Sequence, residues 1–247
     1  MFQENYVVQL IISAVAALLA LSVHEYSHAL AAYKLGDPTA KSLGRLTLNP
    51  LKHLDLFGTL CMILFHFGWA KPVPINARYF KNPRKGFAIT ALAGPASNVL
   101  LGFIVAFIYL VCANFFKYTN SPFLNNLMYN TLVFLYTLHI VNIGLGVFNL
   151  IPIPPFDGSR IVNVLLPQKL YFKVMKYERY VYFAVVGWML LGSYVYRLLI
   201  SFDFISTSAF LSGFVRIFSL TTIISDCITF ISELMFKLFA LLPFITY

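Results

Sequence analysis

The chain has 247 residues, of which 60% are hydrophobic and only 11% are charged. A soluble domain of this length carries roughly 25% charged residues, so the composition excludes an ordinary water-soluble globular protein and predicts an integral membrane protein. The net charge of +9 is interpreted as a signal of loop orientation, and we expect no nucleic acid partner.

Apolar runs of about 20 residues indicate membrane-spanning helices. Four runs qualify: Tyr6 to Tyr33, Gly86 to Phe115, Tyr129 to Ile151, and Arg179 to Ile200. The start of the chain lacks a basic region and a small-residue cleavage site, so we expect the first run to remain in the mature protein. A fifth run, from Phe210 to Leu242, contains four charged residues. It is either one tilted span or a span followed by an interfacial helix.

These runs predict an all-α polytopic membrane protein with about five to six transmembrane segments. We expect one membrane-embedded domain over residues 1–202, with its core at 6–165. A C-terminal transmembrane or interfacial helical segment is expected over residues 203–247.

The run from Phe57 to Ala70 is apolar but short, and runs of this length are often re-entrant. Pro, Gly and alternating apolar residues surround it, which predicts short strands near Thr39 to Leu48 and Val73 to Asn76. Non-helical backbone is tolerated at membrane depth where protein or a water-filled cavity shelters it. We therefore expect a short re-entrant or β-hairpin region here.

Basic residues are divided unevenly among the predicted loops. They gather at residues 34–85 and 160–179, whereas the loop between the second and third spans carries only Lys117 and the N-terminal tail carries none. Because basic loops face the cytoplasm, we expect the N-terminus outside the cell. If residues 57–70 are re-entrant, all the basic residues of 34–85 lie on one side of the membrane.

His24, Glu25 and His28 form an HExxH motif at the end of the first apolar run. Residues four apart share one face of a helix, so both imidazoles can bind one metal ion. Glu25 follows the first ligand and can take a proton from a water molecule at the metal. A solvated helix face is the alternative, but ionisable groups in a membrane segment are costly without a functional partner.

A catalytic zinc ion usually has three protein ligands, and Asp157 is the third candidate. It lies in the run NLIPIPPFDG, which returns to the same side of the membrane as His28. The prolines exclude ordinary helix there, and Gly158 is expected to permit an unusual backbone angle. Taken alone, this run would be a proline-rich turn with a solvated aspartate.

Together, HEYSH, AGPASN (Ala93 to Asn98) and NLIPIPPFDG resemble the three signatures of the site-2 protease family, and the intervening GDPTAKSLGRLTLNPLKHLDLFGTL and GWAKPVPIN resemble its compact bacterial and archaeal members. The resemblance covers roughly residues 20 to 165. It implies an intramembrane zinc metalloendopeptidase without PDZ or CBS domains, containing one Zn²⁺ ion per chain.

The resemblance implies roles for five residues. His24, His28 and Asp157 hold zinc, Glu25 is the general base and acid, and Asn149 binds the substrate carbonyl or oxyanion. The expected substrates are transmembrane proteins or peptides within the bilayer, cut by regulated intramembrane proteolysis. The expected location is the cell inner (plasma) membrane, with the active site toward the cytoplasm. The oligomeric state is left open.

Other polar residues have two interpretations each. His139, Asn142, Gly146 and Asn149 recur on one helical face and either line the active-site cavity or form interhelical hydrogen bonds. Residues 94–98 are mostly small and are expected to pack against the zinc helix, with Asn98 contacting a ligand loop. His53 and His66 are expected to be satisfied or interfacial, and the three cysteines to be buried and inert.

Two other functions fit parts of the pattern. A metal transporter would not need Glu25 and would place polar residues along a path across the membrane, whereas here they cluster near one side. A non-catalytic zinc-binding scaffold would tolerate the loss of a ligand or the base, yet all four candidates are present.

Overall fold

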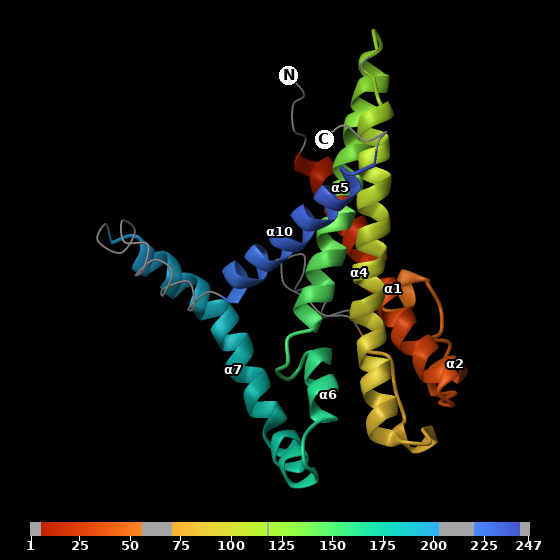
Figure 1. The fold of residues 1–247 in the computed structure, drawn as a ribbon, viewed down its shortest axis with the longest axis vertical. Helices are drawn as coiled ribbons and strands as arrows, with labels where there is room; N and C mark the ends of the chain where they lie inside the picture. Colours follow the sequence, from red (N-terminus) through yellow and green to blue (C-terminus); the bar gives the residue numbers. More distant parts are fainter. Residues whose placement is uncertain (1–5, 56–70, 118, 203–219, 243–247) are drawn as a thin grey trace.

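The computed structural model describes residues 6–55, 71–117, 119–202 and 220–242, and this part of the chain is helical, without strands (Figure 1). The elements are α1 (Tyr6–Lys34), α2 (Thr39–Ser42), the 3₁₀ helices η1 (Pro50–Lys52) and η2 (Ala77–Tyr79), α4 (Pro83–Phe115), α5 (Pro122–Asn149), α6 (Asp157–Asn163), α7 (Gln168–Ile200) and α10 (Leu220–Phe239). The predicted all-α class is therefore confirmed.

Helices α1, α4 and α5 form the central bundle, and all three pairs are in contact. Each is long and apolar enough to cross a membrane, as predicted. The starts of α4 and α5 have the same design. Asn82 and Ser121 accept hydrogen bonds from backbone N–H groups of the first turn, and a proline follows each cap. Proline fits there because N–H groups in the first turn have no partner within the helix, so the helix loses no hydrogen bond when proline lacks one.

Small residues allow the three helices to pack closely. A side chain at Gly102 of α4 would collide with Ile143 of α5, and one at Gly146 of α5 would collide with Val99 of α4. Ala16 of α1 packs with Val105 and other apolar residues of α4 and α5. Close approach of backbones is the usual basis of helix association in membranes, where apolar burial gives little driving force.

Helices α7 and α10 lie outside this bundle (Figure 1). α10 packs on α4 and α5 through Phe236 and Phe239 and also contacts α7. α7 covers the fourth predicted span, yet neither α7 nor α10 is among the described helices that are apolar enough to cross a membrane. The number of spans beyond three, and the division at residue 202, remain predictions.

The strand predicted near Thr39 to Leu48 is wrong. Thr39–Ser42 forms the helix α2, because the Asp37 carboxylate accepts a hydrogen bond from the Thr39 N–H and closes a turn that starts the helix. Residues 71–76 are extended but pair with no other strand of the described residues. The expected re-entrant segment and His66 lie outside the described residues.

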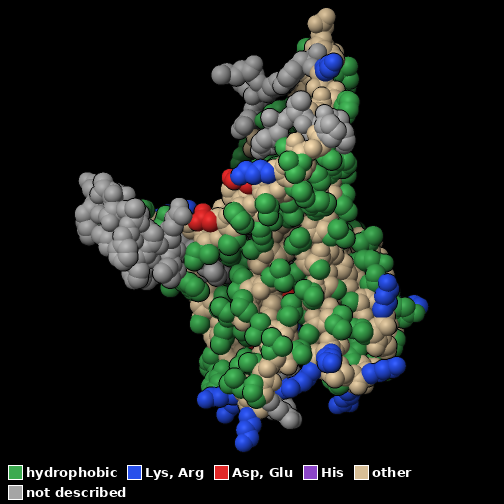
Figure 2. All heavy atoms as spheres, viewed as in Figure 1, with side chains coloured by type: hydrophobic (Ala, Val, Ile, Leu, Met, Phe, Trp, Pro, Cys, Tyr) green, Lys and Arg blue, Asp and Glu red, His purple; other side chains and the backbone are tan. Residues whose placement is uncertain are grey.

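Charge and topology agree along the long axis. α1 and α5 run in one direction and α4 in the other, so the connection between α1 and α4 and the connection around α6 lie at the same end (Figure 1). Lys and Arg side chains gather at this end, and apolar side chains cover the middle of the visible face (Figure 2). The two basic loops therefore share one end of the molecule, and the connection between α4 and α5 lies at the opposite end.

Candidate metal centre and active site

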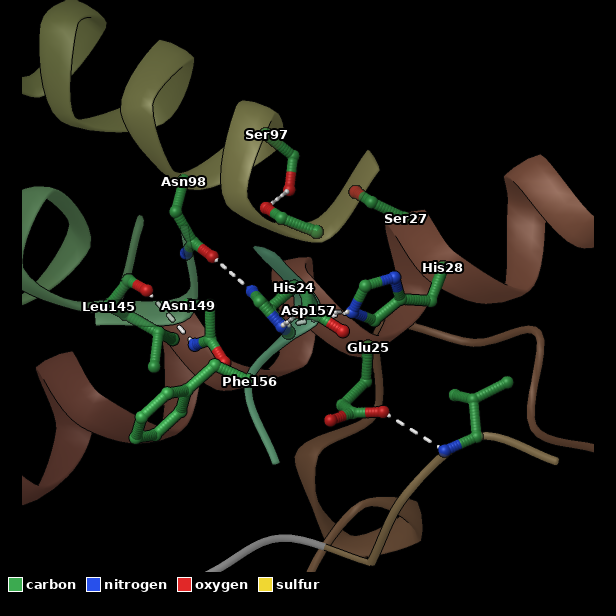
Figure 3. Close-up of polar contacts among 12 residues, drawn as sticks. His24, Glu25, Ser27, His28, Ser97, Asn98, Leu145, Asn149, Phe156 and Asp157 are labelled. Atoms are coloured by element: carbon green, nitrogen blue, oxygen red, sulfur yellow. Dashed lines mark hydrogen bonds and ion pairs between the residues drawn. The ribbon is translucent and has the colours of Figure 1, made fainter. Parts of the chain in front are cut away.

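His24, Glu25 and His28 lie on the last three turns of α1, and all three are buried. The helical spacing places the two imidazoles on one face, with their ring centroids 4.6 Å apart. α4 covers this face, since a side chain at Gly94 would collide with both rings. The histidines therefore lie in the centre of the bundle rather than on a solvated helix face (Figure 3).

Asp157 reaches the same point from the first residue of α6. Its Oδ2 lies 3.2 Å from Nε2 of His24 and 3.1 Å from Nε2 of His28. The two Nε2 atoms are 3.0 Å apart. Tetrahedral zinc with ligand bonds of 2.0–2.1 Å separates its ligand atoms by about 3.3 Å. The three atoms thus already have nearly the spacing that one zinc ion requires.

The tautomer of His24 follows from its second nitrogen. Its Nδ1 lies 2.6 Å from Oδ1 of Asn98. The Asn98 Nδ2 donates to the Ala20 carbonyl oxygen and to Oδ1 of Asn142, which fixes the orientation of the amide. Oδ1 of Asn98 can only accept, so Nδ1 of His24 carries the proton. Its Nε2 is left with a lone pair that points toward Asp157.

The same reasoning applies to His28. Its Nδ1 lies 2.7 Å from the Thr90 carbonyl oxygen, an acceptor, and therefore carries the proton. Two imidazole lone pairs and a carboxylate oxygen consequently converge, and such a group needs a cation or an added proton between its members. Metal-binding histidines typically donate their other N–H to a carbonyl or a carboxylate. The donor set thus fits zinc, and the candidate ligand atoms of the three side chains all lie within 4.8 Å of one another.

The charge of Asp157 suits a metal ligand. Burial alone would raise the pKa of this carboxyl group, but when the imidazoles of His24 and His28 carry a second proton, their hydrogen bonds to the carboxylate outweigh burial and lower the pKa to about 2. The carboxylate is therefore ionised at neutral pH, which is the form that binds a metal ion.

Glu25 lies in the wall of a cavity of about 390 Å³ that also exposes the three candidate ligands. Its Oε2 accepts a hydrogen bond from the Val73 N–H at 3.1 Å. The remaining wall comes from the extended segment 71–76, from α4, and from Asn149, Pro155 and Arg160. The cavity thus brings a carboxylate, the candidate metal ligands and room for a peptide together.

Asn149 lines this cavity, and its Nδ2 donates to the Leu145 carbonyl oxygen at 3.0 Å. Asn142 and His139 lie deeper and are fully buried. Asn142 bonds to Asn98, and Nδ1 of His139 lies 2.9 Å from the Gly102 carbonyl oxygen. The polar stripe of α5 therefore divides between the two interpretations, with Asn149 at the cavity and the other two residues in contacts between helices.

His53 does not belong to the candidate metal site formed by His24, His28 and Asp157. It is buried, and its Nε2 donates to the Thr47 carbonyl oxygen at 2.8 Å. Of the three cysteines, the described ones are Cys112, which is half-buried, and Cys227, which is exposed. The expectation that all cysteines are buried is wrong for Cys227, which lies on a helix with little of its surface covered.

Two glycines have roles that sequence reasoning assigned imperfectly. A Cβ atom at Gly94 would lie 2.6 Å from Cε1 of His28 and 2.8 Å from Cε1 of His24, so this residue makes room for the imidazoles themselves. Gly158 does not adopt the expected unusual backbone angle. It is needed because a Cβ atom there would lie 2.5 Å from the Ile151 carbonyl oxygen.

Asn98 also differs from its expected role. It was predicted to contact a ligand loop, but it binds a candidate ligand, His24, directly. The signal was available in the spacing, because Gly94 and Asn98 are four residues apart and must share one face of α4. A glycine that admits the imidazoles and an amide that binds one of them thus belong to the same surface.

Comparisons with known proteins agree with this geometry. Peptidase family M50, the site-2 protease family, matches residues 12–192. The chain is 40% identical to "Putative zinc metalloprotease YwhC" of Bacillus subtilis (strain 168), over 73% of this chain and 82% of the relative. It is 36% identical to "Zinc metalloprotease MJ0392" of Methanocaldococcus jannaschii, over 40% of this chain and 25% of the relative. No solved structure matches. The chain is an integral membrane protein that belongs to peptidase family M50, the site-2 family of zinc metalloproteases.

Proposed function

We propose that this protein is an intramembrane zinc metalloendopeptidase that hydrolyses peptide bonds of transmembrane substrates. One zinc ion per chain is held by His24, His28 and Asp157. The observation that carries the proposal is the convergence of two imidazole lone pairs and a carboxylate oxygen within 3.0–3.2 Å of one another. This group lies in the same cavity as the separate carboxylate of Glu25.

When bound, zinc supplies a Lewis acid that activates water and polarises the scissile carbonyl group. Glu25 accepts the proton of the attacking water and later gives it to the leaving amine nitrogen. Asn149 orients the substrate by donating from its amide to the carbonyl oxygen, where negative charge develops. The Nδ1–H groups of His24 and His28 donate to Oδ1 of Asn98 and to the Thr90 carbonyl oxygen, which holds both rings in place.

The substrate must be unwound before it is cut, because hydrogen bonds protect the backbone of a helix. Segment 71–76 is extended, and Pro72, Val73 and Ile75 line the cavity. We propose that an unwound substrate lies along this segment in extended form, as peptides do when they add to a strand. This arrangement would present a peptide carbonyl to the metal and to Glu25 together.

A metal transporter and a zinc-binding scaffold are the alternative functions. Neither function explains the carboxylate of Glu25, which lies in the same cavity as the candidate ligands but is not one of them. The buried polar chain from His24 through Asn98 ends at Asn142, which bonds to a carbonyl oxygen of its own helix. These hydrogen-bonded side chains therefore provide no path of metal ligands that leads away from the candidate metal site.

The function is tested by separating metal binding from chemistry. Glu25→Gln keeps the size of the side chain but removes the base, so zinc stays bound while cleavage falls by about 10²–10⁴-fold. Asp157→Ala removes one of three protein ligands and lowers the zinc content itself. Zinc content and cleavage of a fluorescent transmembrane peptide are measured on the purified protein in detergent. Normal cleavage by Glu25→Gln would favour the scaffold or transporter.

We further propose that the protein lies in the cell inner membrane, with the active site toward the cytoplasm and the N-terminus outside. The support is the gathering of basic residues at the end that carries the start of α4 and the link through α6 (Figure 2). Single cysteines at positions 84 and 173 are expected to react with an impermeant label from the cytoplasmic side, and one at position 120 from the opposite side. Labelling of positions 84 and 173 from different sides would contradict this orientation.

A further inference from the structure

Two buried charged side chains have no part in the chemistry proposed above. Asp37 is 0% exposed and Arg45 is 7% exposed, and both belong to the connection that joins α1 to α4. A charge is costly to bury unless hydrogen bonds satisfy it. Neither residue forms an ion pair with another described residue, and both direct their charge at the backbone around segment 71–76.

Arg45 holds the beginning of this segment. Its Nη2 donates to the carbonyl oxygens of Lys71 and Pro72. Hydrogen bonds from a charged donor are stronger than those between neutral groups. An extended segment has no internal hydrogen bonds of its own, so the guanidinium group fixes carbonyl groups that secondary structure leaves unpaired.

Asp37 holds the end of the segment. Its Oδ2 accepts the Asn76 N–H at 2.7 Å, while its Oδ1 accepts the N–H and the hydroxyl group of Thr39. The two oxygens of one carboxylate therefore join the start of α2 to the end of segment 71–76. An amide side chain has only one acceptor oxygen and cannot make both connections.

A glycine in the left-handed region precedes each of these residues. Gly36 has φ +106° and Gly44 has φ +66°. Residues other than glycine rarely adopt these backbone angles. Each glycine reverses the chain directly before the charged residue, once at the end of α1 and once at the end of α2. The dipeptides Gly36-Asp37 and Gly44-Arg45 thus each supply a turn followed by a buried charge.

Between the two held ends, the segment meets the candidate base. The Val73 N–H donates to Oε2 of Glu25 at 3.1 Å. The Val73 side chain packs against Ala29 of α1 and Ala40 of α2 in a small buried cluster. The position of segment 71–76 therefore decides where the hydrogen-bond donor to Glu25 lies, and the same segment forms one wall of the cavity.

We propose that Asp37 and Arg45 are positioning residues of the peptidase. Together they form a backbone clamp that fixes segment 71–76 at both ends. The clamp sets the orientation of the Glu25 carboxylate through the Val73 N–H and sets the shape of the cavity wall along which substrate lies. This inference rests on the proposed function, and it assigns a role in that function to residues outside the metal centre.

The physical reason is the sensitivity of catalysis to geometry. A displacement of about 1 Å at a reacting group can lower the rate by about 10²-fold even when its cause lies far from the chemistry. If one end of the segment is released, the Val73 N–H shifts and Glu25 loses a fixed orientation. Within the described residues, the hydrogen bonds of His24, His28 and Asp157 go to Asn98, Thr90 and one another rather than to the segment, so zinc remains bound.

The test uses the full chain in detergent with four clamp variants. Asp37→Asn keeps the size of the side chain and retains only one of the two backbone connections, and Arg45→Ala removes the other end of the clamp. Arg45→Lys keeps a cation that can donate to one carbonyl group, and Asp37→Ala is the severe variant. Asn49→Ala is the matched control, because Asn49 is an exposed capping residue of η1 in the same region and is outside the clamp.

Three quantities are measured for each variant: zinc content, kcat and KM for a fluorescent transmembrane peptide, and hydrogen exchange of fragments covering residues 71–76. We expect Asp37→Asn and Arg45→Ala to retain zinc, to exchange about tenfold faster in this segment, and to lower kcat by about 10–10²-fold. Arg45→Lys should recover most of the activity that Arg45→Ala loses. Asn49→Ala should match the unmodified protein in all three quantities.

Three results would overturn the clamp. Unchanged exchange in residues 71–76 would show that the charges do not hold the segment. Faster exchange with unchanged kcat per zinc-loaded molecule, or losses of activity fully accounted for by lost zinc in both Asp37→Asn and Arg45→Lys, would show that they do not position Glu25. Failure of the proposed function looks different, because then Glu25→Gln cleaves as well as the unmodified chain while hydrogen exchange still reports on the clamp.

Discussion

The chain up to the end of α6 and the chain from α7 onward bury different kinds of side chain. The first part buries histidines, asparagines and charged residues between α1, α4, α5 and the loops that join them. In the described part of α7 and α10, the buried polar side chain is Ser232, and the other buried side chains are apolar. Polar groups are expensive inside a membrane. Their burial, rather than apolar packing, therefore marks the part of this molecule that carries the chemistry.

Glycines show the same difference. Gly94 of α4 lies where a Cβ atom would collide with both candidate zinc-binding imidazoles, whereas a Cβ atom at Gly187 of α7 would meet nothing within 4 Å. The two residues are both helical, so the intrinsic effect of alanine on the helix is the same at each. Any difference between the two substitutions therefore reports on the surroundings.

We expect the largest effect from Gly94→Ala. The added methyl group must displace His28 and His24, so the protein should lose stoichiometric zinc and nearly all peptidase activity. Gly187→Ala should retain both and should be neutral or slightly stabilising, by about 0.5–1 kcal/mol, because alanine favours the helix. Zinc analysis and thermal unfolding of the two purified variants make the comparison. Full zinc binding by Gly94→Ala would show that the metal is held elsewhere.

A smaller effect is expected from Asn98→Ala. This change leaves the ligands in place but removes the acceptor of the His24 Nδ1–H. Loss of such a partner typically lowers metal affinity or activity by about 10–100-fold. Zinc affinity is measured by competition with a chelator of known strength. Asn130→Ala is the control, because Asn130 is half-buried on the same bundle and, among the described residues, bonds to Asn126 of its own helix α5. Equal affinities in both variants would remove Asn98 from the metal centre.

Much of the central bundle was predictable because the relevant signals are local. The four-residue spacing of His24 and His28 determines a shared helix face, and the length of the apolar runs determines α1, α4 and α5. The proline-rich run before Asp157 predicted a break after α5, and the structure has one there. The convergence of Asp157 on the histidines was inferred from topology, and the described structure brings the three side chains together.

The connection between α1 and α4 was not predictable in the same way. Alternating apolar residues near Thr39 predicted a strand, but the Asp37 carboxylate closes a turn that starts α2 instead. The buried contacts of Asp37 and Arg45 with Asn76 and Lys71 join residues far apart in the sequence. No periodic pattern encodes such a contact. The close fit of Gly158 against carbonyl groups was likewise invisible without the fold.

X-ray absorption at the zinc edge reports directly on the atoms that bind zinc. We expect one zinc ion per purified chain, bound by two imidazole nitrogens at about 2.0–2.1 Å and by carboxylate oxygen at about 2.0–2.2 Å. The spectrum of Glu25→Gln should retain both imidazoles, since Glu25 is not a proposed ligand, and the spectrum of Asp157→Ala should change. A shell of sulfur at about 2.3 Å, or a chain purified with its histidines intact that binds no zinc, would show that His24, His28 and Asp157 do not form a zinc site.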